Sequence, residues 1–285
     1  MEGGSPQRID VRALFMAKNP RVAQRIPAFG YALLEGLAHQ RELNDAIARL
    51  SGFEGRAFIR EALATLDVKT VVKGAERIPH TGRLTFCANH PLGGADGLAL
   101  MALSYSARDD FLWPTNDLVM MIPQLASHAV PINKHGSNQG LAQALDAMYG
   151  SDKAVMVFPA GRTSRPRRGR LIEFPWAKGF VKKSRQHGRL IIPVHVSGRN
   201  SALFYGLWRA RSALGIRPNL EMFLLVDELL KQRGATLELR VGQPLDPSAW
   251  LPADDQSSAD ALCAYVDALG LDENAVFKGL DYAHG

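Results

Sequence analysis

Two residues six positions apart, His90 and Asp96, have the side-chain types that general acid–base chemistry requires. A carboxylate that holds one ring nitrogen of a histidine fixes the tautomer, and the other nitrogen can then take a proton from a weak hydroxyl nucleophile. Such a base accelerates a reaction by roughly 10²–10⁴-fold. The same spacing also fits an aspartate that caps a helix beside a hydrogen-bonded histidine. The spacing alone leaves both interpretations open.

The segment that joins the two residues is Asn89-His90-Pro91-Leu92-Gly93-Gly94-Ala95-Asp96. The run 84–88 before it predicts a strand, and a helix is expected over 95–107. A proline and two glycines in between favour a turn. Asp96 would then lie in the first helical turn, where exposed backbone N–H groups favour an acid, and the glycine pair lets the carboxylate fold back towards the imidazole.

A second polar loop follows the predicted strand 154–158. Its sequence is Phe158-Pro159-Ala160-Gly161-Arg162-Thr163-Ser164-Arg165-Pro166. Backbone N–H groups freed by the glycine, together with Arg162, suit a phosphate or a carboxylate. A solvated basic loop has the same composition, so this loop by itself does not exclude a plain surface segment.

The elements that must position these loops alternate between strands and helices from about residue 67. This alternation predicts an α/β fold with a mostly parallel or mixed central sheet flanked by helices. We expect an N-terminal helical extension over 1–66 and the α/β domain over 67–285. The predicted strands are 68–72, 84–88, 129–132, 154–158, 190–196 and 236–241, and the predicted helices after residue 66 are 95–107, 137–149, 200–214, 222–233 and 257–269. Functional groups in such sheets gather just beyond the strand carboxyl ends, where the loops after 88, 158 and 196 are expected to meet.

Positive charge is concentrated in one stretch of the chain, whose overall net charge is +6. Between Arg162 and Arg189 there are ten Lys or Arg residues and one acid, Glu173. The stretch predicts an anionic partner, such as a membrane surface, a phosphorylated cofactor or an acidic carrier protein. No nucleic acid is expected, because aromatic residues do not interleave with the basic ones as they do in single-strand binders. The 174–183 segment fits either contact with lipid headgroups or an amphipathic helix packed on the core.

The blocks Asn89–Asp96, Phe158–Gly161 and Ile192–Val194, in this order, resemble the glycerolipid acyltransferase superfamily, of the lysophosphatidic-acid acyltransferase type. The pattern His-Pro-x-Gly-Gly-x-Asp is similar to that of the bacterial hemolysin-like acyltransferases. Val130–Lys134 falls where the superfamily has its second block. The resemblance covers residues from about 67 to 245 and includes the three loops at the predicted strand ends.

The resemblance implies that His90 deprotonates an acceptor hydroxyl and that Asp96 supports it. It assigns substrate binding to Asn89, Lys134, Phe158, Pro159, Gly161, Arg162, Arg165 and Pro193. The basic residues would hold the acceptor headgroup, and Pro193 would line the channel of the acyl donor or the acceptor. The implied donor is a thioester of acyl carrier protein or coenzyme A, and neither a further cofactor nor a metal is expected. The implied location is the cytoplasmic, inner face of a membrane, in peripheral association.

Two positions depart from the pattern of the superfamily. Five residues, not the usual four, separate His90 from Asp96, and Ala160 occupies the usual place of a glutamate. The block that contains Ala160, the third of the superfamily, contributes to glycerol-phosphate binding in the family. Its change therefore favours a lyso-aminolipid acceptor, such as one built on ornithine, over a simple glycerol phosphate, and a lysophospholipid is the other candidate. A hydrolase with the same two residues and a non-catalytic protein that binds anionic lipid are the alternative functions.

Overall fold

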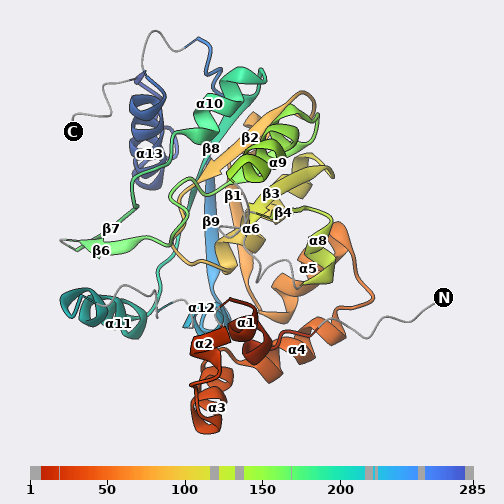
Figure 1. The fold of residues 1–285 in the computed structure, drawn as a ribbon. Helices are drawn as coiled ribbons and strands as arrows, with labels where there is room; N and C mark the ends of the chain where they lie inside the picture. The colour runs from red at the N-terminus through yellow and green to blue at the C-terminus, as the bar shows by residue number, and fades with distance from the viewer. Residues whose placement is uncertain are drawn as a thin grey trace.

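The structure, a computed structural model, describes residues 8–18, 20–115, 122–131, 138–167, 169–215, 221, 224–249 and 254–279. Its centre is a seven-stranded sheet in the order β1-β9-β8-β2-β5-β3-β4 (Figure 1). The strands are β1 (Lys69–Lys73), β2 (Leu84–Ala88), β3 (Phe111–Thr115), β4 (Ala129–Pro131), β5 (Ala154–Val157), β8 (Leu190–Val196) and β9 (Thr236–Val241). A separate antiparallel hairpin pairs β6 (Arg165–Arg167) with β7 (Arg170–Ile172).

Five neighbouring strands of the sheet, from β8 to β4, are parallel to one another. Strand β9 is antiparallel to β8, and β1 is parallel to β9. The sheet is therefore mixed and mostly parallel, which confirms the predicted fold class. The parallel pairing also brings the carboxyl ends of β2, β5 and β8 to one edge, where ligand sites collect in open α/β sheets.

Helices lie around this sheet (Figure 1). They are α1 (Val11–Lys18), α2 (Pro20–Ala23), α3 (Ala28–Leu37), α4 (Gln40–Arg49), α5 (Gly55–Thr65), α6 (Ala95–Ala107), α8 (Pro123–Ala126), α9 (Asn138–Gly150), α10 (Gly179–Gln186), α11 (Ala202–Ala213), α12 (Leu225–Leu230) and α13 (Asp255–Leu271), with a 3₁₀ turn over Ala75–Arg77. Among the described helices, none combines the length and the apolar character that crossing a bilayer requires.

Every residue of strand β2 is buried, as expected for a central strand covered on both faces. Its alternate residues Leu84, Phe86 and Ala88 enter a core that includes residues of α5 and α6. Cys87 belongs to a second core with residues of α9, α10 and α13. Helices therefore pack on both faces of β2, the strand that precedes His90, and this burial fixes the position of its carboxyl end.

The N-terminal helices differ in how they bury their apolar side chains. Helix α5 packs against α6, and Phe58 and Ile59 belong to the core of the α/β sheet. Helix α3, in contrast, leaves Phe29, Leu33 and Leu37 exposed, with 78%, 63% and 37% of their surface accessible. These three residues are four positions apart, so they form one apolar stripe along the helix, which we call the α3 stripe.

Several predicted elements coincide with the structure. The bounds of β2, β8, β9 and α6 match the predictions, whereas β3 and the β6–β7 hairpin were not predicted and α12 is shorter than the predicted helix 222–233. Within the 174–183 segment, Trp176 and Phe180 are buried in the core and Lys182 is exposed. This burial favours the amphipathic core helix over the headgroup contact.

Candidate active site

His90 and Asp96 meet at the carboxyl end of β2. The Nδ1 atom of His90 lies 3.0 Å from Oδ2 of Asp96, which is fully buried. The His90 side chain keeps 16% of its surface accessible, and among the described residues no hydrogen-bond partner is found for its Nε2. A histidine held in this way has its tautomer fixed, and its second nitrogen is left for a substrate proton.

The carboxylate of Asp96 also organises the turn. Its Oδ2 accepts from the backbone N–H groups of Leu92 at 2.8 Å and Gly93 at 3.1 Å, and its Oδ1 accepts from Gly97 N–H at 2.9 Å. One carboxylate therefore binds both the imidazole and the backbone N–H groups of the turn that precedes α6, and the catalytic interpretation stays a prediction. The extra residue is accommodated in a turn where Gly93 adopts φ +92°, a conformation that favours glycine.

The environment shifts the two pKa values apart. Burial by itself lowers the pKa of His90, but the charge and hydrogen bond of Asp96 outweigh it, so the pKa lies above its ordinary value. Burial raises the pKa of Asp96, but His90 and the N–H groups of Leu92 and Gly93 outweigh that effect and hold it below its ordinary value. The dyad is therefore an ionised carboxylate that makes the imidazole a stronger base.

Aromatic rings pack against the imidazole. The ring of Phe158, from the loop after β5, stacks on His90 with centroids 4.2 Å apart. Trp113 of β3 contacts Phe158 edge-on at 6.5 Å, and both rings are partly buried against the core. One side of His90 is therefore apolar, which limits the rotation of the ring and provides a surface for a hydrocarbon chain.

Helix α12 packs against the two glycines of the turn. A Cβ added to Gly93 would lie 2.8 Å from Leu225 and 3.0 Å from Thr163, and one added to Gly94 would contact Leu229. The lack of a side chain at these two glycines therefore allows α12 and the loop with Thr163 to pack closely, in addition to allowing the turn itself.

The loop after β5 holds Arg162 and Arg165 in different environments. Arg162 is exposed, with its guanidinium 5.4 Å from the ring centroid of Phe174. Arg165 is buried, donates to the carbonyl of Thr163 at 2.6 Å and forms an ion pair with Glu221 at 3.0 Å. Of the two, Arg162 is accessible to a headgroup, while the guanidinium of Arg165 stabilises the loop from within.

The remaining predicted residues are spread over the same edge of the sheet. Asn89 bridges β2 to β8, since its side chain donates to Val196 O at 2.9 Å and accepts from Val196 N–H at 2.6 Å. Gly161 is exposed at the tip of the loop with φ +59°, and Pro159 O accepts from Ala177 N–H at 3.1 Å. These contacts give Asn89 and Pro159 roles in holding the strand ends and the loop in place.

The structure does not bring Pro193 to His90. Pro193 is buried in β8 opposite Cys87, and strand alternation places it on the face covered by α13, whereas Asp96 lies on α6 at the other face. Lys134 lies outside the described residues. The predicted roles of both residues therefore stay predictions.

Among the described basic residues between 162 and 189, four are held by partners within the chain. They are Arg165 with Glu221, Lys183 with Asp146, Arg185 with Asp255, and Arg189 with four backbone carbonyl groups. The stretch is consequently not one continuous basic surface, and its charge alone is weaker support for an anionic partner than the sequence suggested.

Sequence reasoning missed one residue of the site, Glu173. Its Oε1 accepts from the backbone N–H of His90 at 3.2 Å and from the hydroxyl of Ser164. Glu173 was noted only as the one acid in the basic stretch. No motif marks it, because the contact with His90 depends on the hairpin that precedes it.

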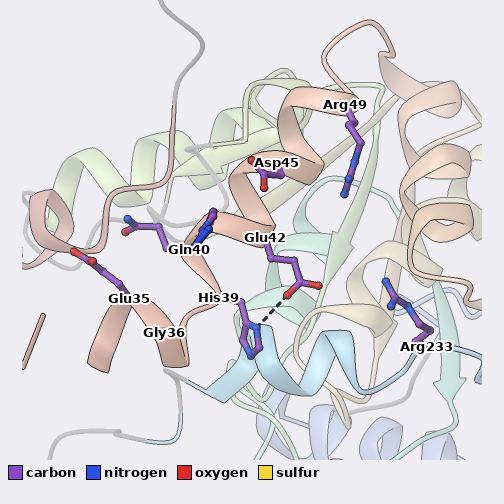
Figure 2. A pocket seen from close by; sticks show the side chains of 9 residues that line it. Glu35, Gly36, His39, Gln40, Glu42, Asp45, Arg49 and Arg233 are labelled. Atoms are coloured by element: carbon purple, nitrogen blue, oxygen red, sulfur yellow. Dashed lines mark hydrogen bonds and ion pairs between the residues drawn. The ribbon is translucent and has the colours of Figure 1, made fainter. Parts of the chain in front are cut away.

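A pocket of about 550 Å³ lies away from this site, between α3, α4 and Arg233. Figure 2 shows His39 with a bond to Glu42 inside it, and none of the predicted site residues lines it. The Nε2 of His39 also lies 3.1 Å from Asp227 of α12, the helix whose Leu225 and Leu229 approach the His90 turn. The pocket is thus separated from His90 by α12.

The site is an aspartate-oriented histidine at a strand end of an α/β fold, next to a polar loop and the apolar rings of Phe158 and Trp113, a geometry suited to base catalysis. Comparison with known proteins specifies the class further. The sequence profile of the family described as Acyltransferase matches residues 13–257. The chain belongs to the acyltransferase family and is an enzyme, which confirms the resemblance of its three blocks.

Two curated relatives carry the same description, lyso-glycine lipid O-acyltransferase. The protein of Phocaeicola vulgatus is 37% identical over 241 residues, which cover 83% of this chain and 86% of the relative. That of Bacteroides thetaiotaomicron is 36% identical over 262 residues, or 90% and 94% of the two chains. Among solved structures, the 1-acyl-sn-glycerophosphate (LPA) acyltransferase PlsC of Thermotoga maritima is 16% identical with a TM-score of 0.47, over 90% of this chain and 92% of that one.

Proposed function

We propose that this enzyme transfers a fatty acyl group from a thioester donor to the hydroxyl of a lysolipid, with His90 as the general base. The observation that carries the proposal is the contact of 3.0 Å between His90 Nδ1 and the buried Asp96, which leaves Nε2 for the acceptor. This geometry supports proton abstraction from a hydroxyl whose own pKa is far too high for it to ionise unaided.

The proposed reaction follows from the position of the proton. Nε2 of His90 takes the hydroxyl proton as the acceptor oxygen attacks the thioester carbonyl carbon. The carbon–sulfur bond then breaks, and the departing thiolate receives the proton from the imidazolium. Asp96 stabilises the imidazolium in between and does not itself take the proton. Acyl carrier protein and coenzyme A are both suitable donors for this sequence of steps.

The acceptor we propose is a lyso-aminolipid. The two curated relatives are named for lyso-glycine lipid, whose headgroup is an amino acid, and they align with this chain over most of its length. The absence of an acid at Ala160, where the wider superfamily has one for glycerol phosphate, agrees with such an acceptor. The exposed Arg162 is the side chain that we assign to the carboxylate of the headgroup.

A lipid acceptor requires contact with a membrane surface, and the α3 stripe is our candidate for that contact. Phe29 and Leu33 are largely exposed on it. Because the transfer of large apolar side chains out of water is favourable, both are suited to insertion into a lipid surface. Arg25 and Arg41 flank the helix in sequence and are suited to anionic headgroups. The proposed location is therefore peripheral, at the inner face of a membrane.

The test is a product analysis with the purified protein. It is incubated with acyl carrier protein or coenzyme A thioesters and a panel of lyso-glycine, lyso-ornithine and glycerophosphate lipids, and the lipids are measured by mass spectrometry. We expect a diacylated aminolipid and an equal amount of free thiol. Free fatty acid as the main product would assign a hydrolase instead, and no consumption of any thioester would contradict acyl transfer altogether.

A further inference from the structure

Glu173 connects the His90 turn to the loop after β5. It follows the β6–β7 hairpin, and its Oε1 accepts from His90 N–H at 3.2 Å and from the Ser164 hydroxyl. The carbonyl of His90 in turn accepts from Ser164 N–H at 2.8 Å. Both backbone polar groups of His90 are thus held by residues Ser164 and Glu173, which fixes the backbone from which the imidazole projects.

Hydrogen bonding alone does not account for an acid at this position. The second oxygen of Glu173, Oε2, is buried and makes no hydrogen bond of standard geometry among the described residues, although the side chain of Trp176 lies near the carboxylate and favours its charge. Burial also raises the pKa of Glu173 above its ordinary value, which means that the site disfavours its charge. A glutamine would make the same two bonds through one oxygen without that cost.

The charged groups around this carboxylate suggest what the acid does. Asp96 and Glu173 both raise the pKa of His90, and Arg165 opposes them. The charge of Glu173 also raises the pKa values of Asp267 and Cys263 of α13, beyond the larger effect of their own burial. Two carboxylates therefore stabilise the imidazolium that would form during a proton transfer. Asp96 acts from α6, and Glu173 acts from the segment after the hairpin.

We infer that Glu173 is a positioning residue for His90, which holds its backbone amide and places a second negative charge beside its ring. This inference deepens the proposed function, and only its kinetic part rests on that function. The role explains why the site retains an acid whose charge is disfavoured by burial. The loop from 158 to 166 contains no acid of its own, so the hairpin supplies one from outside it.

The test that does not depend on activity is a titration of the His90 ring by NMR, with the signal assigned through its absence in His90→Ala. We expect Glu173→Gln to lower the pKa of His90 by about 0.5 to 1 pH unit, a small value for a nearby charge because Asp96 remains. The matched control is Asp267→Asn, which removes an acid that interacts electrostatically with Glu173 but not with His90. An unchanged pKa in Glu173→Gln, or an equal fall in the control, would overturn the inference.

The kinetic arm uses the same variants. Glu173→Gln should lower kcat about tenfold with little change in KM, and the acid limb of its pH profile should move to lower pH. Glu173→Asp keeps the charge, so its His90 pKa should lie nearer to the wild-type value even if the shorter side chain costs activity. A His90 pKa as low as that of Glu173→Gln would contradict the role of the charge. An inactive wild-type enzyme with the expected NMR shifts would refute the proposed function and leave the inference intact.

Discussion

Replacing Asp96 with asparagine separates the two tasks of its carboxylate. Oδ2 faces three N–H groups, those of His90 Nδ1, Leu92 and Gly93, while Oδ1 faces the N–H of Gly97. An asparagine has one acceptor oxygen, so its amide NH₂ must oppose at least one of these donors. The imidazole also loses the negative charge that orients it and strengthens it as a base.

The expected magnitudes follow from these contacts. Loss of one hydrogen bond to a buried charge costs about 1.5–3 kcal/mol of folding free energy, which a domain of this size tolerates. The loss of the oriented base should lower kcat by about 10²–10⁴-fold, or about 2.7–5.4 kcal/mol in the activation barrier. KM should change little, because Asp96 is fully buried and cannot contact the substrate.

The assay is steady-state release of thiol from the acyl donor in the presence of the lysolipid, combined with thermal unfolding of each variant. The control is Asp110→Asn, an acid that pairs with Arg108 beyond the far end of α6. It should retain wild-type kcat. A folded Asp96→Asn enzyme with wild-type kcat, or with an effect confined to KM, would refute the catalytic role of the dyad.

Three further predictions follow. Neutral His90 is the active form in this account, and Asp96 raises its pKa above the ordinary value of 6.5. The ratio kcat/KM should therefore be constant at high pH and fall as the pH drops through a value above 6.5. A plateau that extends below pH 6.5 would contradict the assignment. Gly93→Ala should destabilise the protein by about 1–3 kcal/mol more than Gly82→Ala in thermal unfolding. Both glycines have positive φ, but only at Gly93 would the added Cβ be crowded, 2.8 Å from Leu225. Equal losses of stability would contradict the role of this packing. Phe29→Ser should weaken binding to anionic liposomes about tenfold in sedimentation, the cost of one lost apolar side chain, whereas Leu271→Ser, equally exposed at 78%, should not; equal effects would exclude the α3 stripe as the contact.

The elements around the dyad are predictable from the sequence because each has a burial pattern that local residue types determine. Strand β2 is apolar on both faces, and α6 begins after a turn of proline and glycine, so both bounds follow from local rules. The contact of His90 with Asp96 is equally local, since it spans six positions. Strand β3 was missed because it is short and contains Pro114, which argues against a strand.

The less predictable part of the site depends on distant pairing. Arg165 and Glu221 are 56 positions apart, and nothing in the basic loop distinguishes the buried arginine from the exposed Arg162. Glu173 reaches His90 across 83 positions through two strands of three residues, too short for any periodicity. Burial and ion pairing of individual side chains are tertiary properties, and only the folded arrangement assigns them.

The proposed role of His90 is tested most directly by comparing His90→Ala with the wild-type enzyme in the thioester and lysolipid assay. His80→Ala, a change at an exposed histidine whose ring bonds the Ala107 carbonyl, serves as the control. We predict that His90→Ala stays folded and loses at least about 10²-fold in kcat, while His80→Ala keeps wild-type turnover. Wild-type production of the acylated lipid by folded His90→Ala would contradict the assignment of His90 as the general base.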